Sequence, residues 1–148
     1  MARNANFISQ FVMGGDPCTY KESGELQAEM SKLTHPARPD VDWRQVEKLS
    51  LALFRQNGVE LQTLVCYVLA ITRRQGLAGM ADGLGSLDIL LQRWADFWPV
   101  QVHSRISLLN WVTEKMQQAL RTLDIQYQDL PQIYRCVQHL SAIETTLQ

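Results

Sequence analysis

The 148-residue sequence predicts an all-α fold, an antiparallel bundle of about six helices with an extended N-terminal arm. Three observations support this prediction. Apolar residues recur every three to four positions in successive stretches, which is typical of helices with one buried face. Proline, glycine and capping residues separate these stretches. No stretch shows a convincing alternation of apolar and polar residues, as a half-buried strand would.

The arm is predicted over residues 1–20, because no apolar period is sustained there. The segment 7–13 resembles a short strand, and "GGDP" has the composition of a turn. Residues 21–148 then form one helical domain, whose length is enough to bury a core without a disulfide or a metal.

The first helix is predicted over residues 21–33, where Leu26, Met30 and Leu33 recur on one face. The segment "THPARPD" ends it. Each of its two prolines disfavours helical backbone at the residue before it, so a loop must follow.

Asp42 is the predicted N-cap of the second helix, and Gln45 stands where it would complete a capping box. The dipeptide "NG" ends this helix. Both of its flanks have a helical period, so Gly58 is expected in the left-handed region after a helix. The predicted buried face comprises Trp43, Val46, Leu49 or Ser50, Leu53 and Phe54.

The third helix, from about Glu60 to Gln75, is predicted to be the central one because apolar residues occupy most of its circumference. Arg73 and Arg74 fall in its last turn, where cations suit the negative end of the helix dipole. Gly76 is the predicted stop.

The fourth helix is predicted from about Ala78 to Phe97, with Pro99 as its end. Gly79, Gly83 and Ser86 recur on one face of this helix as a ridge of small residues. Such a ridge lets a second helix approach closely, as it does in membrane proteins. The sequence assigns no role to Gly85.

The glycine-rich stretch "QGLAGMADGLGSL" is not a phosphate-binding loop. The P-loop motif requires a lysine and a hydroxyl residue directly after its last glycine, and the chain has neither there. A dinucleotide-binding glycine motif must follow a strand, whereas this stretch follows a predicted helix.

Ser104 is the predicted cap of a fifth helix, and Asp129 of a sixth with Pro131 in its first turn. The sixth helix reaches the end of the sequence without a stop signal, so the chain is expected to be a fragment of a longer protein. The expected apolar stripe of the fifth helix is Ile106, Leu109, Val112 or Thr113, Met116, Leu120 and Leu123; that of the sixth is Ile133, Val137, Leu140, Ile143 and Leu147.

Composition excludes several classes of protein. The net charge is −1, which argues against a nucleic-acid-binding bundle. The longest apolar run is far shorter than the roughly 20 residues of a spanning helix. The odd number of cysteines, none in a CxxC pair, argues against a disulfide framework or a zinc site and favours a reducing compartment.

No catalytic, cofactor-binding or metal-binding site is predicted. His35, His103 and His139 lie in separate regions, and no pair of carboxylates has a partner that would raise one pKa. Trp94 and Trp98 would share one face of the fourth helix as core anchors or as a binding hot spot. An alternative is therefore a helical enzyme or ligand-binding domain with its pocket near Trp94, Trp98 and His103.

Four segments of the sequence resemble a known family and follow one another in the order found there. They are "GGDP", "KLTHPARPDVDWRQVEKLSLALFRQNGVELQTLVCYVLA", "GLAGMADGLGSLDILLQRWADFWP" and "VHSRISLLNWVTEKMQQALRTL". Together they resemble the ImpA N-terminal domain of type VI secretion proteins over about residues 14–123. Within that group the chain is most similar to the VasL/TagA branch, relatives of TssA. The residues that match the family pattern are Trp43, Gly76, Gly79, Gly83, Trp94, Trp98 and Trp111.

The resemblance implies a non-enzymatic protein–protein interaction module of a type VI secretion assembly protein. Such proteins act on the baseplate and the sheath in the bacterial cytoplasm, and TagA-like members are associated with the distal end of the sheath near the inner membrane. The implied partners are TssA-like, sheath or baseplate proteins, with no cofactor and no nucleic acid. The matched residues are expected to serve architecture rather than chemistry.

Overall fold

The computed structural model describes residues 8, 10–37, 39–93 and 102–147. These contain six α-helices and no strand longer than a single bridge, which confirms the predicted all-α fold. The helices are α1 (Lys21–Met30), α2 (Trp43–Gln56), α3 (Leu61–Gln75), α4 (Leu77–Leu91), α5 (Val102–Leu120) and α6 (Leu130–Leu147), with 3₁₀ turns η2 (Ser31–Thr34) and η4 (Tyr127–Asp129).

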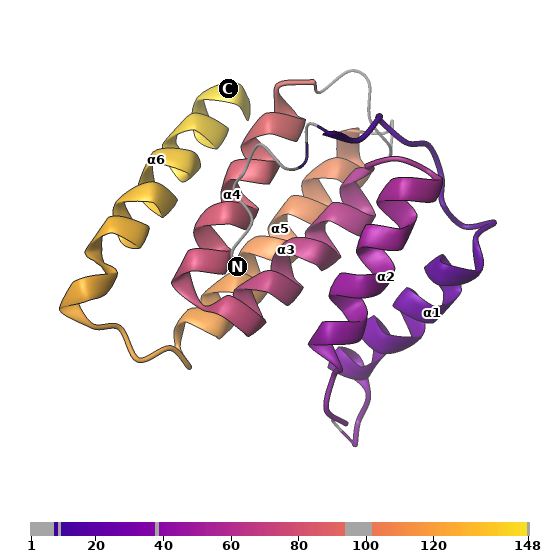
Figure 1. Cartoon of the computed structure of the whole chain (residues 1–148), viewed down its shortest axis with the longest axis horizontal. Helices are drawn as coiled ribbons and strands as arrows, with labels where there is room; N and C mark the ends of the chain where they lie inside the picture. Colours follow the sequence, from indigo (N-terminus) through magenta and orange to yellow (C-terminus); the bar gives the residue numbers. More distant parts are fainter. Residues whose placement is uncertain (1–7, 9, 38, 94–101, 148) are drawn as a thin grey trace.

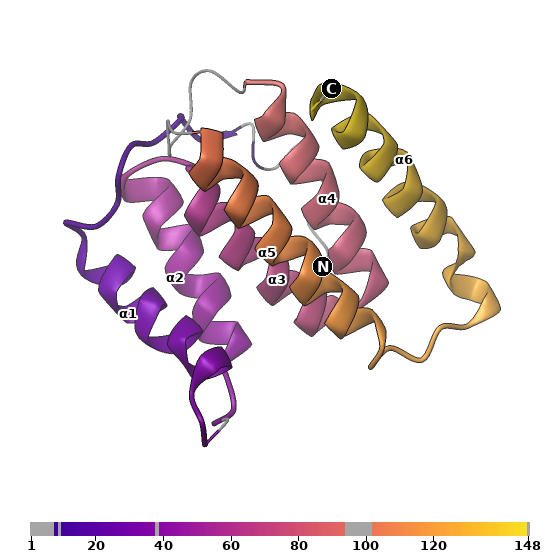
Figure 2. The same cartoon turned by 180° about the vertical axis from the view of Figure 1, so that it is seen from behind.

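The helices form two layers. In Figure 1, α2, α3, α4 and α6 lie side by side in that order, and α1 and α5 lie behind them, facing the viewer in Figure 2. Consecutive helices alternate in direction (Figure 1), as predicted. However, α6 packs on α4 rather than on α5, so these two neighbours run parallel.

The N-terminal arm crosses the turn between α2 and α3. Met13 and Val59 form one parallel β-bridge, in which the N–H of Val59 donates to the carbonyl oxygen of Val12 at 2.7 Å. Gly58 adopts a φ of 99°, as predicted for the residue after a helix. Ile8 is only 4% exposed and belongs to the main core, so this residue packs against the helices.

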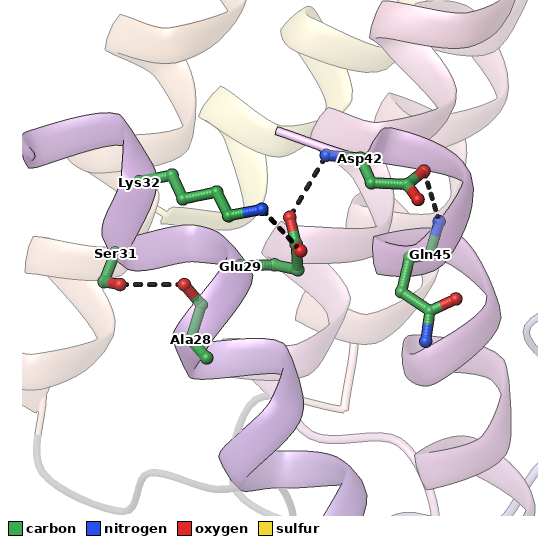
Figure 3. A network of polar contacts seen from close by, with 6 residues as sticks. All are labelled: Ala28, Glu29, Ser31, Lys32, Asp42 and Gln45. Atoms are coloured by element: carbon green, nitrogen blue, oxygen red, sulfur yellow. Dashed lines mark hydrogen bonds and ion pairs between the residues drawn. The ribbon is translucent and has the colours of Figure 1, made fainter. Parts of the chain in front are cut away.

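A polar network joins the end of α1 to the start of α2 (Figure 3). Asp42 caps α2 as predicted, its Oδ1 accepting the N–H of Gln45 at 3.2 Å. The other half of the predicted capping box is wrong. The N–H of Asp42 donates to Oε2 of Glu29 at 3.1 Å, and Lys32 holds the other oxygen of that carboxylate at 2.8 Å. A residue from another helix therefore completes the cap.

Helix α3 is the central helix, as predicted. Every residue from Thr63 to Thr72 is buried, and α2, α4 and α5 all pack on this helix. Its Tyr67 meets Phe54 of α2 edge to face, with ring centroids 5.5 Å apart. Gly76, with a φ of 67°, alone connects α3 to α4, which makes the two helices adjacent and antiparallel.

The predicted ridge of small residues on α4 is confirmed, and its partner is α3. A Cβ at Gly79 would overlap the carbonyl oxygen of Ile71, and one at Gly83 would lie 2.6 Å from Cγ1 of Val68. Ser86 is buried and donates its hydroxyl to the carbonyl oxygen of Asp82 at 3.1 Å. The ridge thus sets the distance between the two helices. Gly85 is also buried but lies off this ridge.

We expect Gly83→Leu to lower the free energy of unfolding by roughly 1–3 kcal/mol, because the new side chain must displace Val68 from a fully packed contact. Chemical denaturation of the variant beside the unchanged chain measures the loss. An equal unfolding midpoint would mean that the ridge does not hold α3 and α4 together.

Helix α4 is shorter than predicted. It ends at Leu91, where the N–H of Gln92 bonds the carbonyl oxygens of Asp88 and Leu90, and a turn follows. The prediction of a helix up to Phe97 is therefore wrong, because a continuous apolar spacing does not require continuous helical backbone. Trp94 and Trp98 lie outside the described residues, as does Pro99.

The predicted start of the fifth helix needs correction, whereas the sixth helix begins directly after Asp129 as predicted. Helix α5 begins at Val102, so Ser104 and His103 lie inside it rather than before it. Asp129 immediately precedes α6, yet its Oδ2 accepts the N–H of Gln126 at 2.8 Å and closes η4. Pro131 is in the first turn of α6 as predicted. The predicted stripes are partly exposed, since Ile106, Val137 and Leu140 are 48%, 52% and 49% accessible.

Candidate interaction surface

The described tryptophans of the family pattern lie in different places. Trp43, at the start of α2, is half-buried, and the guanidinium of Arg73 stands 5.7 Å from its ring centroid as a cation–π contact. Trp111 of α5 is half-buried and packs against the main core and against a second buried cluster that includes Leu26, Val46 and Leu69. The two therefore support the bundle at separate positions, whereas Trp94 and Trp98 lie outside the described residues.

Trp111 also borders a pocket between α1, α3 and α5. The pocket has a volume of about 380 Å³. Its lining comes from three segments distant in the sequence: Gln27, Met30 and Ser31 from α1 and η2, Gln62, Val65 and Cys66 from α3, and Ser107, Leu108 and Trp111 from α5.

The pocket combines an apolar floor with an uncharged polar rim. Met30, Val65 and Cys66 are buried, while Gln27 and Ser107 are exposed at the edge. Burial raises the pKa of the Cys66 thiol to about 12, so this thiol stays protonated and is a poor nucleophile at neutral pH. The pocket therefore suits an apolar side chain with hydrogen-bonding neighbours rather than covalent chemistry.

A second groove lies between α5 and α6, over α4. It has a volume of about 350 Å³. None of its lining residues is charged: Met80, Leu84, Leu87, Leu109, Asn110, Val112, Thr113, Met116, Gln117, Leu120, Leu140 and Ile143. In Figure 2, α4 lies between α5 and α6. Met80, Leu84 and Leu87 of α4 line the groove between them.

Two polar contacts hold α6 on α4. Nη2 of Arg135 lies 2.6 Å from Oδ1 of Asp82, whose side chain is only 7% exposed. One helical turn further on, Nδ1 of His139 lies 3.7 Å from Oδ2 of Asp88. The Asp82 carboxylate is buried and would lose its charged partner if α6 shifted, so this contact favours the observed register of α6 along α4.

Glu60 is a buried carboxylate that the sequence analysis did not single out. It is fully buried immediately before α3, where its two oxygens accept the N–H groups of Gln62 and Thr63 at 2.7 and 2.6 Å. Burial raises the pKa of Glu60 to about 7, although these hydrogen bonds partly oppose the shift. No reactive partner adjoins it among the interactions described, so Glu60 serves as a helix cap.

The three histidines lie in different parts of the structure and do not form a common site. His35 is exposed and its Nδ1 accepts the N–H of Ala37 at 3.0 Å, His103 is exposed on α5, and His139 faces Asp88. Among the described residues, no three side chains of His, Cys, Asp or Glu are grouped as a metal ion would require. Within the same ranges, no helix combines the length and apolarity needed to span a membrane.

A match to a known protein family identifies the family of this helical bundle. The model of the ImpA N-terminal domain of the type VI secretion system matches residues 8–114. The chain belongs to the ImpA N-terminal family. No curated protein and no solved structure matches the chain.

The ImpA N-terminal match covers all seven residues of the pattern quoted from the sequence, from Trp43 to Trp111. It also covers every residue that lines the α1–α3–α5 pocket. Helix α6 lies beyond it. The sequence placed Met30 on one helix face and Trp111 in the family pattern, but it assigned neither to a pocket and gave no role to Gln27, Gln62 or Leu108. Residues that line a pocket from three helices share no local pattern.

Proposed function

We propose that this chain is a non-enzymatic protein–protein interaction module of a type VI secretion assembly protein of the TagA/VasL/TssA kind. In this proposal residues 1–20 are an arm and residues 21–148 the domain. The module works in the bacterial cytoplasm on the assembly of the sheath or the baseplate, in a longer protein tethered at the inner membrane. Membership of the ImpA N-terminal family is the observation that carries the proposal.

The α1–α3–α5 pocket supports a binding role. Its lining lies wholly within the family match, and it offers an apolar floor beside a half-buried tryptophan. Tryptophan is enriched among the residues that dominate binding energy, and such residues cluster in desolvated pockets. We therefore assign to this pocket an apolar anchor side chain of a type VI secretion partner.

The alternative of an enzyme or ligand site near Trp94, Trp98 and His103 has no such support. His103 is exposed on α5, and both tryptophans lie outside the described residues. The α1–α3–α5 pocket and the α5–α6 groove lie elsewhere, over α3 and over α4.

We expect Ser107→Trp to weaken binding of the chain to its secretion partner by roughly tenfold or more, because the new ring would occupy the pocket. Purified TssA-like, sheath and baseplate proteins from the same bacterium are the binding partners to titrate, by calorimetry. Thr145→Trp is the matched control, since Thr145 is an exposed helical residue far along α6.

Absence of binding between the unchanged chain and all three classes of partner would contradict the proposed function. If both tryptophan variants bound the partner equally well, the chain would still be an interaction module, but the α1–α3–α5 pocket would not be its binding site. The branch is tested separately: a membrane segment in the full-length gene product would favour a TagA-like protein over TssA itself.

A further inference from the structure

Positive charge is concentrated on two neighbouring helices. Helices α2 and α3 together carry five lysine or arginine residues and a single carboxylate, whereas the rest of the chain carries nine and fourteen. The net charge of the whole chain is −1, so this excess is local. A local excess of one sign raises the concentration of partners of the opposite sign near that surface.

Three of these cations form a row on the exposed side of α2. Arg44, Lys48 and Arg55 share one helix face at separations of four and seven residues, and all three are exposed. Within the described ranges, none of them forms an ion pair. This basic row is about 16 Å long, which is more than a single phosphate group can bridge.

The basic row borders a hollow with a mostly charged lining. The hollow has a volume of about 320 Å³, and its lining consists of the three cations, Glu47 and Leu51. Leu51 is buried, and Glu47 forms an ion pair with Arg74 of α3. Because the carboxylate of the hollow is already paired with a residue outside it, the three cations have no counter-charge of their own there.

Carboxylates flank the basic row at both ends of α2. They are Glu29, Asp40 and Asp42 at its start, and Asp16 and Glu22 at its end, with Glu25 between Glu22 and Glu29 on α1. Figure 3 shows Glu29 and Asp42 at the start of α2. An extended anionic surface, such as a membrane or a nucleic-acid duplex, would meet these carboxylates together with the cations. A narrow acidic chain could follow the row alone.

We infer that the basic row binds an acidic segment of a partner protein, with carboxylates aligned along Arg44, Lys48 and Arg55. An extended segment of about five residues, or about three turns of helix, has the required length. Single ion pairs at an exposed site contribute little, so the row acts through several contacts at once and by steering the encounter.

This contact is additional to the pocket of the proposed function. No residue of α2 lines the α1–α3–α5 pocket. Ser107→Trp should therefore leave the binding of an acidic probe unchanged, whereas substitutions in the basic row should leave the pocket open. The two hypotheses can fail separately.

The test is a titration of the isotope-labelled chain with an oligoglutamate peptide at low salt, followed by amide chemical shifts. We expect the largest shifts along residues 44–55, and an affinity that falls as salt screens the contact. The double variant Arg44→Glu/Arg55→Glu should bind roughly tenfold more weakly, because two attractions become repulsions. Arg93→Glu/Arg121→Glu is the matched control, since both arginines are exposed and lie outside the row.

The amide spectra also show that both double variants are folded. Absence of peptide binding, or an equal loss of affinity in both double variants, would overturn the inference. Oligothymidine and phosphatidylglycerol vesicles are titrated in parallel, and tighter binding of either through the basic row would reassign it to a nucleic acid or a membrane. Shifts along α2 that depend on the concentration of the chain alone would reassign it to a second copy.

Discussion

Replacing Gly79 with alanine should destabilise the fold by about 3 kcal/mol, although the change adds a single methyl group. The new Cβ would overlap the carbonyl oxygen of Ile71 and lie 2.6 Å from its carbonyl carbon. These are backbone atoms of a central helix and have no rotamer into which they could move. Helices α3 and α4 must therefore separate, which loosens the core that both help to form.

Gly24→Ala is the matched control for this prediction. Gly24 is exposed inside α1, and a Cβ there would meet nothing within 4 Å. Alanine is a better helix former than glycine, so this variant should be stabilised by roughly 0.5–1 kcal/mol. Urea denaturation of both variants measures the two changes. A similar gain in both would show that glycine at position 79 reflects no close helix contact.

The second large effect concerns Glu60 and pH. Its pKa is about 7 in the folded chain and about 4.5, the ordinary value of a glutamate, in the unfolded chain. The folded state therefore retains a proton that the unfolded state releases as the pH rises through this window. One pKa unit corresponds to about 1.4 kcal/mol. The free energy of unfolding should therefore fall by about 3 kcal/mol as the pH rises from 4.5 to 7, and Glu60 should cause no further fall above pH 7.

Glu60→Gln isolates the pH-dependent part of this contribution, because the amide cannot ionise. Its one oxygen can replace only one of the two carboxylate oxygens that accept the N–H groups of Gln62 and Thr63, and the resulting loss does not vary with pH. We expect the variant to gain on the unchanged chain as the pH rises from 5 to 8. The free energy of unfolding of both chains at each pH gives the difference, in which the other titrating groups cancel. A difference that stayed constant with pH would contradict the raised pKa.

The two predictions differ in how far the sequence alone could have led to them. The spacing of Gly79, Gly83 and Ser86 was enough to predict a close helix contact on one face of α4, because a ridge depends only on helical period. That the contact is with Ile71 and Val68 follows from Gly76, because a connection of one residue places the start of α4 directly against the end of α3.

Glu60, in contrast, had no local signal. Glutamate is not among the residues favoured at a helix N-cap, and its complete burial results from segments that converge on it in the folded chain. Similarly, Asp42 was recognisable as a cap from its own position, whereas the contribution of Glu29 to that cap required α1 to lie beside α2. The end of α4 at Leu91 was also missed, because the apolar period continues to Trp98 in the sequence.

The sequence by itself determined that this protein is a bundle of helices, where most of them start and stop, which helix is central, and to which family the four segments belong. These properties depend on residues within a few positions of one another, or on the order of segments along the chain. Only the tertiary structure decided that α6 lies parallel to α4, and that one pocket opens over α3 and one groove over α4. Those features depend on which distant side chains fill the space between helices, and helical period alone does not specify that.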